Sequence, residues 1–183
     1  INDFQVIEDD TEASVFISSL MLDIEPGLLD EISFKIEPMI NSVAEPIHAI
    51  FNVEMLAQGT QGIILPIFGL YSGYLNKIEL TFLFIDGSSS SFFKEVQAEV
   101  YDNPLTLEVI ALPDSLDKPS YSYFYLKSFY GIHILDIDGN FRWAANDPIN
   151  SISSHYENGV FWIFIDDEMH ELKLSGQAVI SNI

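Results

Sequence analysis

The sequence predicts an all-β protein with two consecutive parts, an antiparallel, immunoglobulin-like β-sandwich and a partial β-propeller of about one blade. Stretches of alternating apolar and polar residues recur along the chain, which is the period-two pattern of half-buried strands. Turn sequences rich in Gly, Asn and Asp separate these stretches at short intervals, as in hairpins. Only residues 28–31 and 42–48 have helical character, and it is weak.

Composition excludes several classes of partner. The chain has 183 residues, of which 48% are hydrophobic, so it can build a substantial core. Its net charge is -21, and its only arginine is Arg142, whereas nucleic-acid binding needs clustered Lys and Arg. An anionic membrane surface is disfavoured for the same reason. The acidic excess is explained better by solubility, in saline water among other settings, than by a dedicated calcium site.

The first residue, the apolar stretches and the absence of cysteine indicate where the protein is located in or outside the cell. The first residue is Ile1 rather than Met, which predicts removal of a leader peptide or of a larger preceding part. Pro66 and Gly69 interrupt the longest apolar stretch, 63–71, so no membrane-inserted helix is expected. The absence of cysteine excludes disulfides and thiolate chemistry. We expect a periplasmic or secreted protein, and a homodimer is left open.

The first predicted domain spans residues 1–103. Its opening is acidic and irregular with a short apolar stretch at 4–7, and residues 32–38 then alternate strictly. A second strand is expected at 49–56. The stretch 63–68 contains Pro66, which a strand tolerates at an edge or a bulge.

A hairpin closes this domain. Residues 76–85 form an alternating strand, the Gly87 region and the serine run 88–91 are expected to turn, and 93–101 alternates again. These elements predict a sandwich of about six or seven strands.

A linker is predicted at residues 104–120, which contain three prolines and little regular pattern. The aromatic stretch beyond it places Tyr121, Tyr123 and Tyr125 on one face of an extended strand. Such aromatic density more often packs against a core than stacks on a ligand.

The predicted first blade of the propeller, 121–183, is organised around the hairpin 131–143. The chain turns at residues 138–140, where Gly139 can adopt a positive φ. After the turn, simple alternation places Phe141 and Trp143 on one face and Arg142 on the other. Further strands separated by turns are expected at 160–165, 170–174 and 178–180.

Two stretches resemble the bacterial aryl-sulfate sulfotransferases. Residues 65–78, Leu-Pro-Ile-Phe-Gly-Leu-Tyr-Ser-Gly-Tyr-Leu-Asn-Lys-Ile, are similar to a motif in the amino-terminal domain of that family. Residues 135–143, Leu-Asp-Ile-Asp-Gly-Asn-Phe-Arg-Trp, are similar to the first propeller blade that follows it, and 158–159 and 171–176 continue that blade in the same order.

The resemblance implies a periplasmic enzyme with a β-sandwich ahead of a propeller. Such an enzyme moves a sulfuryl group from a phenolic sulfate donor to a phenol acceptor, without a nucleotide donor. It does so through a transiently sulfated histidine, aided by further histidines and an arginine of later blades. No residue of this chain matches those positions, so the segment alone is expected to be inactive, with no catalytic, cofactor-binding or metal-binding residue assigned.

The local histidines give little support for catalysis. His133 alternates with apolar neighbours and fits a structural strand histidine, while the acidic run before His170 would raise its pKa. His155, before a loop, is the best of the four candidate nucleophiles, which also include His48. For Arg142, a structural cap or a pair with an aspartate is favoured over binding of sulfuryl oxygens.

Metal and nucleotide sites are also weakly supported. Asp136, Asp138 and Asn140 resemble the start of a calcium loop, but Phe141 stands where that loop needs glycine, so a hairpin turn is favoured. The acidic residues 166–168 fit a solvated turn, and no phosphate-binding loop or nucleophile elbow occurs.

A second class of function is open beside the sulfotransferase-like segment. It is a non-catalytic secreted β-sandwich for binding or adhesion, which would use the aromatic strand beginning at Tyr121 as its surface to hold a partner or a glycan.

Overall fold

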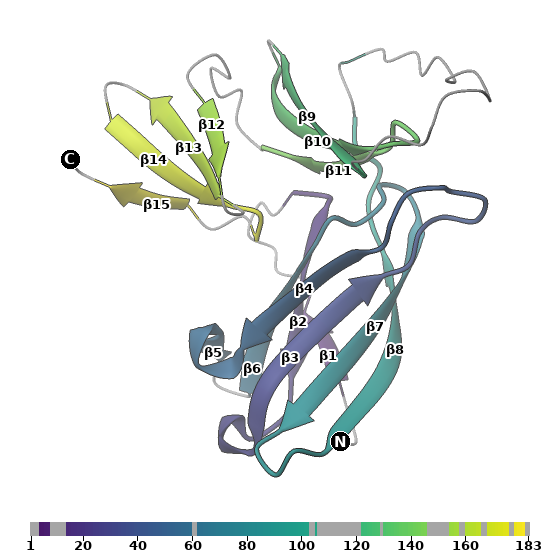
Figure 1. Ribbon diagram of the computed structural model, residues 1–183, viewed down its shortest axis with the longest axis vertical. Helices are drawn as coiled ribbons and strands as arrows, with labels where there is room; N and C mark the ends of the chain where they lie inside the picture. Colours follow the sequence, from purple (N-terminus) through teal and green to yellow (C-terminus); the bar gives the residue numbers. More distant parts are fainter. Residues whose placement is uncertain are drawn as a thin grey trace.

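The computed structural model (Figure 1) describes residues 4–7, 14–59, 62–102, 105, 122–128, 130–145, 154–157, 160–165, 168–175 and 178–181. The fold is all-β, as predicted, and every strand pairing in it is antiparallel. In the described part of the chain the only helices are two short 3₁₀ turns, η1 (Pro26–Leu28) and η2 (Val53–Met55). No helix among these residues is long and apolar enough to cross a membrane.

Two four-stranded sheets form the larger part of the molecule. One has the order β1-β2-β6-β5, with strands Phe4–Ile7, Ile17–Leu22, Gly62–Phe68 and Ala57–Gly59. The other has the order β4-β3-β7-β8, with strands Ile47–Asn52, Leu29–Ile36, Leu75–Phe84 and Ser89–Gln97. The two sheets pack face to face.

The core between these sheets follows from alternation along the strands. In β3, Ile32, Phe34 and Ile36 are buried, and in β7 every second residue from Asn76 to Phe82 is buried. Residues of β2 and β6 complete the same apolar cluster from the facing sheet. Successive side chains of a strand point to opposite faces, so the alternating sequence covers this core on one face and meets solvent on the other.

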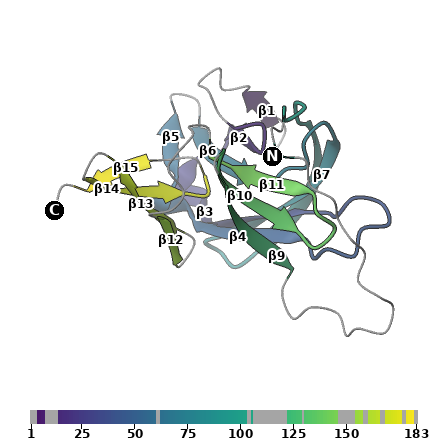
Figure 2. The same ribbon diagram turned by 90° about the horizontal axis from the view of Figure 1, so that it is seen from above.

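Two smaller sheets lie together at one end of the sandwich (Figures 1 and 2). The first has the order β11-β10-β9, with strands Phe141–Ala144, Gly131–Asp136 and Tyr123–Ser128. The second is a meander in the order β12-β13-β14-β15, with strands Ser154–Glu157, Val160–Ile165, Glu168–Lys173 and Ala178–Ser181. The strands of 121–183 thus form two sheets, where the sequence predicted about one blade.

The two smaller sheets meet through their faces. The rings of Trp143 in β11 and Phe161 in β13 stack at 4.9 Å, and with Ile132 and Ile163 they form a second apolar cluster. The Trp143 Nε1–H also donates to the Leu174 carbonyl at 3.0 Å. Burial of these rings against each other holds the two smaller sheets together.

No α-helix forms at 28–31 or 42–48, in agreement with their weak helical character: residue 28 ends η1, β3 begins at Leu29 and β4 begins at Ile47. Two local predictions were wrong. The serine run is mostly strand, since β8 begins at Ser89, and Ser91 is hydrogen-bonded to Thr81 across the sheet. Asn52 caps η2 and ends β4 before residue 56.

The faces of β11 also differ from the prediction. The register of β10 with β11 shifts at Arg142, which forms a bulge. As a result Phe141 packs on the His133 ring at 5.3 Å, whereas Trp143 stacks on Phe161 on the other face.

Pro66 lies in β6 at a position that, in the described part of the chain, has a neighbouring strand on one side only. The short strand β5 pairs only with residues 62–64 of β6, so β6 has no strand neighbour on that side at Pro66 among the described residues. The linker predicted at 104–120 lies outside the described residues except for Leu105, and so does Tyr121.

Candidate functional site

The guanidinium of Arg142 is buried between the sandwich and the smaller sheets. Its Nε and Nη2 atoms donate to the Gly69 carbonyl at 2.9 and 2.7 Å, and Nη1 lies 3.4 Å from Asp136 Oδ2. The group also lies 3.6 Å from the centre of the Tyr71 ring. We call these four residues the Arg142 cluster; they connect the hairpin of β10 and β11 to the loop after β6. The prediction that Arg142 pairs with an aspartate is confirmed.

Glycine is required at the sandwich side of this cluster. Gly69 has a φ of +84°, and a Cβ built there would lie 2.3 Å from Ile47 Cδ1. The loop that follows Gly69 is held by the side chain of Asn76, which is fully buried. Asn76 Oδ1 accepts the Tyr71 N–H at 2.7 Å, and Asn76 Nδ2 donates to the Tyr71 and Tyr74 carbonyls at 3.0 and 2.9 Å. These contacts hold the backbone of Tyr71, two residues after the carbonyl that Arg142 binds.

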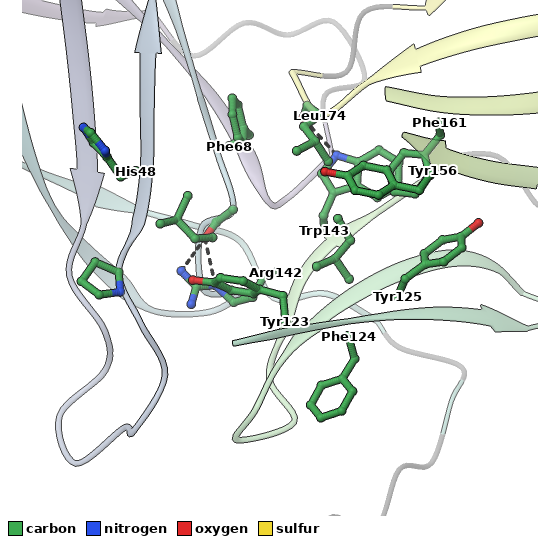
Figure 3. A pocket seen from close by; sticks show the side chains of 14 residues that line it. His48, Phe68, Tyr123, Phe124, Tyr125, Arg142, Trp143, Tyr156, Phe161 and Leu174 are labelled. Carbon is green, nitrogen blue, oxygen red and sulfur yellow. Dashed lines mark hydrogen bonds between the residues drawn. The ribbon is translucent and has the colours of Figure 1, made fainter. Parts of the chain in front are cut away.

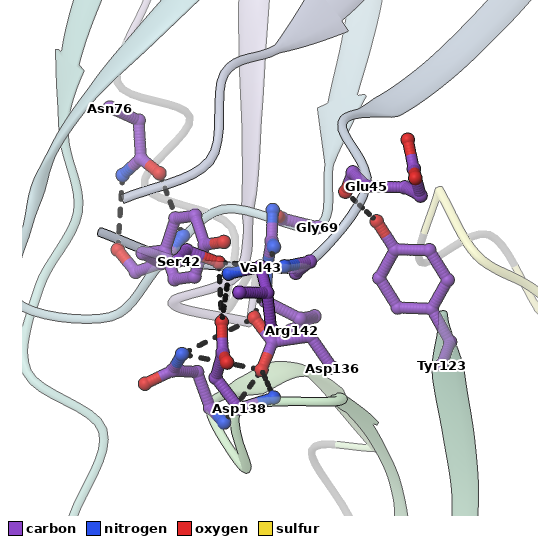
Figure 4. A network of polar contacts seen from close by, with 12 residues as sticks. Ser42, Val43, Glu45, Gly69, Asn76, Tyr123, Asp136, Asp138 and Arg142 are labelled. Atoms are coloured by element: carbon purple, nitrogen blue, oxygen red, sulfur yellow. Dashed lines mark hydrogen bonds and ion pairs between the residues drawn. The ribbon is translucent and has the colours of Figure 1, made fainter. Parts of the chain in front are cut away.

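Asp136 closes the hairpin turn from the other side of the cluster (Figure 4). Its Oδ1 accepts the backbone N–H groups of Asp138 and Asn140 at 3.1 and 2.9 Å. These bonds stabilise the turn, and strands β10 and β11 pair as the predicted hairpin. No group of three or more potential metal ligands occurs in the described ranges.

Further polar contacts join the same two parts of the molecule. The carboxylate of Asp138 accepts hydrogen bonds from the Ser42 hydroxyl and, at 3.1 Å, from the Val43 N–H. The hydroxyl of Tyr123 donates a hydrogen bond to the Glu45 carbonyl at 2.6 Å. Burial raises the pKa of Tyr123 to about 12, so this donor keeps its proton at neutral pH.

The four histidines are dispersed over four strands. His133 in β10 is 1% exposed and its Nε2 lies 3.0 Å from the Tyr101 hydroxyl, as expected of a structural histidine. Burial lowers the pKa of His133. His48 in β4 and His155 in β12 are exposed, and His170 in β14 is half-buried. The structure therefore brings no pair of histidines onto one strand, and the buried one is held by a tyrosine.

A pocket of about 500 Å³ lies where the sandwich and both smaller sheets meet (Figure 3). Phe68 of β6 lies on one side of it, and Trp143, Tyr156 and Phe161 lie on the other. Tyr123 and Tyr125 of β9 also line it, together with Arg142. The aromatic strand predicted from the sequence thus lines a pocket.

Sequence reasoning missed the bonds of Arg142 to the Gly69 carbonyl and the pocket, because both depend on residues distant in the chain. The one available signal was that the two stretches with family resemblance include Gly69 and Arg142. Searches against protein-family models and against curated proteins find no match to this chain.

Proposed function

We propose that this chain is a segment of an aryl-sulfate sulfotransferase-like enzyme, comprising its sandwich domain and the beginning of its propeller. The observation that supports the proposal is the Arg142 cluster. The residues that carry the resemblance in the first stretch, Gly69, Tyr71 and Asn76, contact one another or the residues of the second stretch, Asp136 and Arg142. Two stretches that resemble the same family in sequence also form one structural unit.

In this proposal the cluster has a positioning role. Its one cation is paired with Asp136 and bound to a backbone carbonyl, so Arg142 is not available to bind a sulfuryl group. The histidine that accepts the sulfuryl group from a phenolic sulfate, and passes it to a phenol, lies outside residues 1–183. The enzyme acts in the periplasm or is secreted.

The test compares two proteins encoded by the same gene. One is residues 1–183, and the other is the product of the whole uninterrupted reading frame. Each is given 4-nitrophenyl sulfate and phenol, and release of 4-nitrophenol and formation of phenyl sulfate are measured. We expect transfer by the longer product and none by residues 1–183. Transfer by residues 1–183 that disappears in His155→Ala, or no transfer by the longer product, would contradict the proposal.

The aromatic pocket favours a second candidate function, a non-catalytic binding module. Its walls include Tyr123, Phe124 and Tyr125 of the aromatic strand, with Phe124 41% exposed. If the reading frame contains no further repeats and its product transfers no sulfuryl group, this second candidate is the better explanation.

A further inference from the structure

The aromatic residues that line the pocket between the sandwich and the two smaller sheets contact one another. Phe161 stacks on Trp143 at 4.9 Å and contacts the rings of Tyr125 and Tyr156 at 5.3 and 4.7 Å. Phe161 is 0% exposed, and the Trp143 indole is fixed by its hydrogen bond to the Leu174 carbonyl. An aromatic wall fixed by such contacts does not need to be ordered by a ligand, so binding costs little conformational entropy.

The charge of the pocket is low. Arg142 carries the one permanent charge among the described lining residues, and its guanidinium is paired with Asp136 and bound to the Gly69 carbonyl. The chain as a whole has a net charge of -21, which repels small anions. The pocket therefore favours an uncharged ligand over an aryl carboxylate or an aryl sulfate.

The volume of the pocket and its aromatic lining indicate which class of uncharged ligand it would bind. An apolar cavity of roughly 150 Å³ holds benzene, so a volume of about 500 Å³ accommodates a molecule of two fused rings. Aromatic side chains favour flat π-systems through stacked and edge-to-face contacts, beyond the burial of apolar area. Saturated rings of the same size bury similar area without these contacts.

We propose that the pocket bounded by Phe68, Trp143, Tyr156 and Phe161 is a binding site for small, uncharged aromatic molecules of one or two rings. The site is separate from sulfuryl transfer, since the proposed sulfuryl-accepting histidine lies outside this chain. It also supplies a ligand class for the binding-module function.

The test uses three probes with one carbon skeleton: 2-naphthol, decahydro-2-naphthol and 2-naphthoate. Calorimetric titration of residues 1–183 should give 2-naphthol about tenfold tighter binding than the saturated or the anionic probe. The chain has two tryptophans, which allows an internal control: the indole N–H signal of Trp143 should shift with 2-naphthol in ¹⁵N-correlated NMR. The signal of Trp162, which does not line the pocket, should stay in place.

Matched variants locate the site. Tyr156 is 40% exposed, so Tyr156→Ala removes part of the wall at small cost to folding, and we expect about fivefold weaker binding. Phe93→Ala removes an aromatic ring that is 60% exposed on β8, away from the pocket, and should leave binding unchanged. Equal affinity for the three probes, no binding of 2-naphthol, equal shifts of both indole signals, or equal effects of the two variants would overturn the proposal. Sulfuryl transfer is not measured, so these outcomes are distinct from failure of the proposed function.

Discussion

Replacement of Arg142 by methionine tests the importance of the Arg142 cluster. Methionine keeps the length of the apolar stem but removes the cation from Asp136, which is 0% exposed, and the donors from the Gly69 carbonyl. Removal of one partner of a buried ion pair costs about 3–5 kcal/mol. Asp136 keeps its hydrogen bonds from the N–H groups of Asp138 and Asn140, so the cost should lie at the lower end of this range. We therefore expect the free energy of unfolding to fall by about 3 kcal/mol.

A double-mutant cycle separates the pair from other effects of the change. Asp136→Asn retains an oxygen acceptor for the turn but leaves Arg142 as an unpaired buried charge. The variant with both changes has no unpaired charge, so its destabilisation should be smaller than the sum of the single effects by about 1–3 kcal/mol. Urea unfolding followed by circular dichroism gives the four free energies.

An exposed ion pair provides the control for this cycle. Lys35 and Glu37 lie 2.8 Å apart with side chains 40% and 36% exposed, so Lys35→Met should cost at most about 1 kcal/mol. The reasoning is refuted if Arg142→Met costs no more than Lys35→Met, or if the effects of Arg142→Met and Asp136→Asn add within about 0.5 kcal/mol.

Three further changes test neighbouring parts of the structure by urea unfolding. Gly69→Ala should cost about 1–2 kcal/mol, because alanine is strained at positive φ and its Cβ would displace the end of the Ile47 side chain; a cost below about 0.5 kcal/mol would contradict this. Asn76→Ala should cost about 1–3 kcal/mol, because it leaves the backbone N–H of Tyr71 buried without its acceptor, and unchanged stability would count against that bond. The buried His133 has a lowered pKa, so the unfolded chain binds its proton more readily. Stability should therefore fall as the pH drops below about 6.5, by up to about 1.4 kcal/mol per pH unit, and His133→Gln should reduce this slope; equal slopes in both proteins would disprove it.

Local patterns in the sequence predicted the elements that depend on neighbouring residues. Alternation along β3 and β7 identified both strands, and Gly139, with its φ of +83°, identified the hairpin turn. Side-chain direction in a strand and the conformation of a tight turn are decided within a few residues, so the sequence contains the information needed.

Local sequence patterns could not predict contacts between residues that are distant in the chain. Arg142 binds a carbonyl 73 residues earlier in the chain, and no local property of either residue indicates the other. The bulge at Arg142 has a different origin: it lies within the hairpin, and strict alternation does not anticipate the extra residue that reverses the face expected for Phe141. Ser89 and Ser91 are of a residue type common in turns, yet they pair with Leu83 and Thr81 of β7.

The most direct test of the account is the NMR signal of the Arg142 Nε–H group. The chain has no other arginine, so the signal is unambiguous. The account predicts slow exchange with water, since the group is buried and bonded at 2.9 Å, and a through-hydrogen-bond coupling to the Gly69 carbonyl carbon. Exchange as fast as in an exposed arginine, without such a coupling, would show that the two stretches do not form one unit.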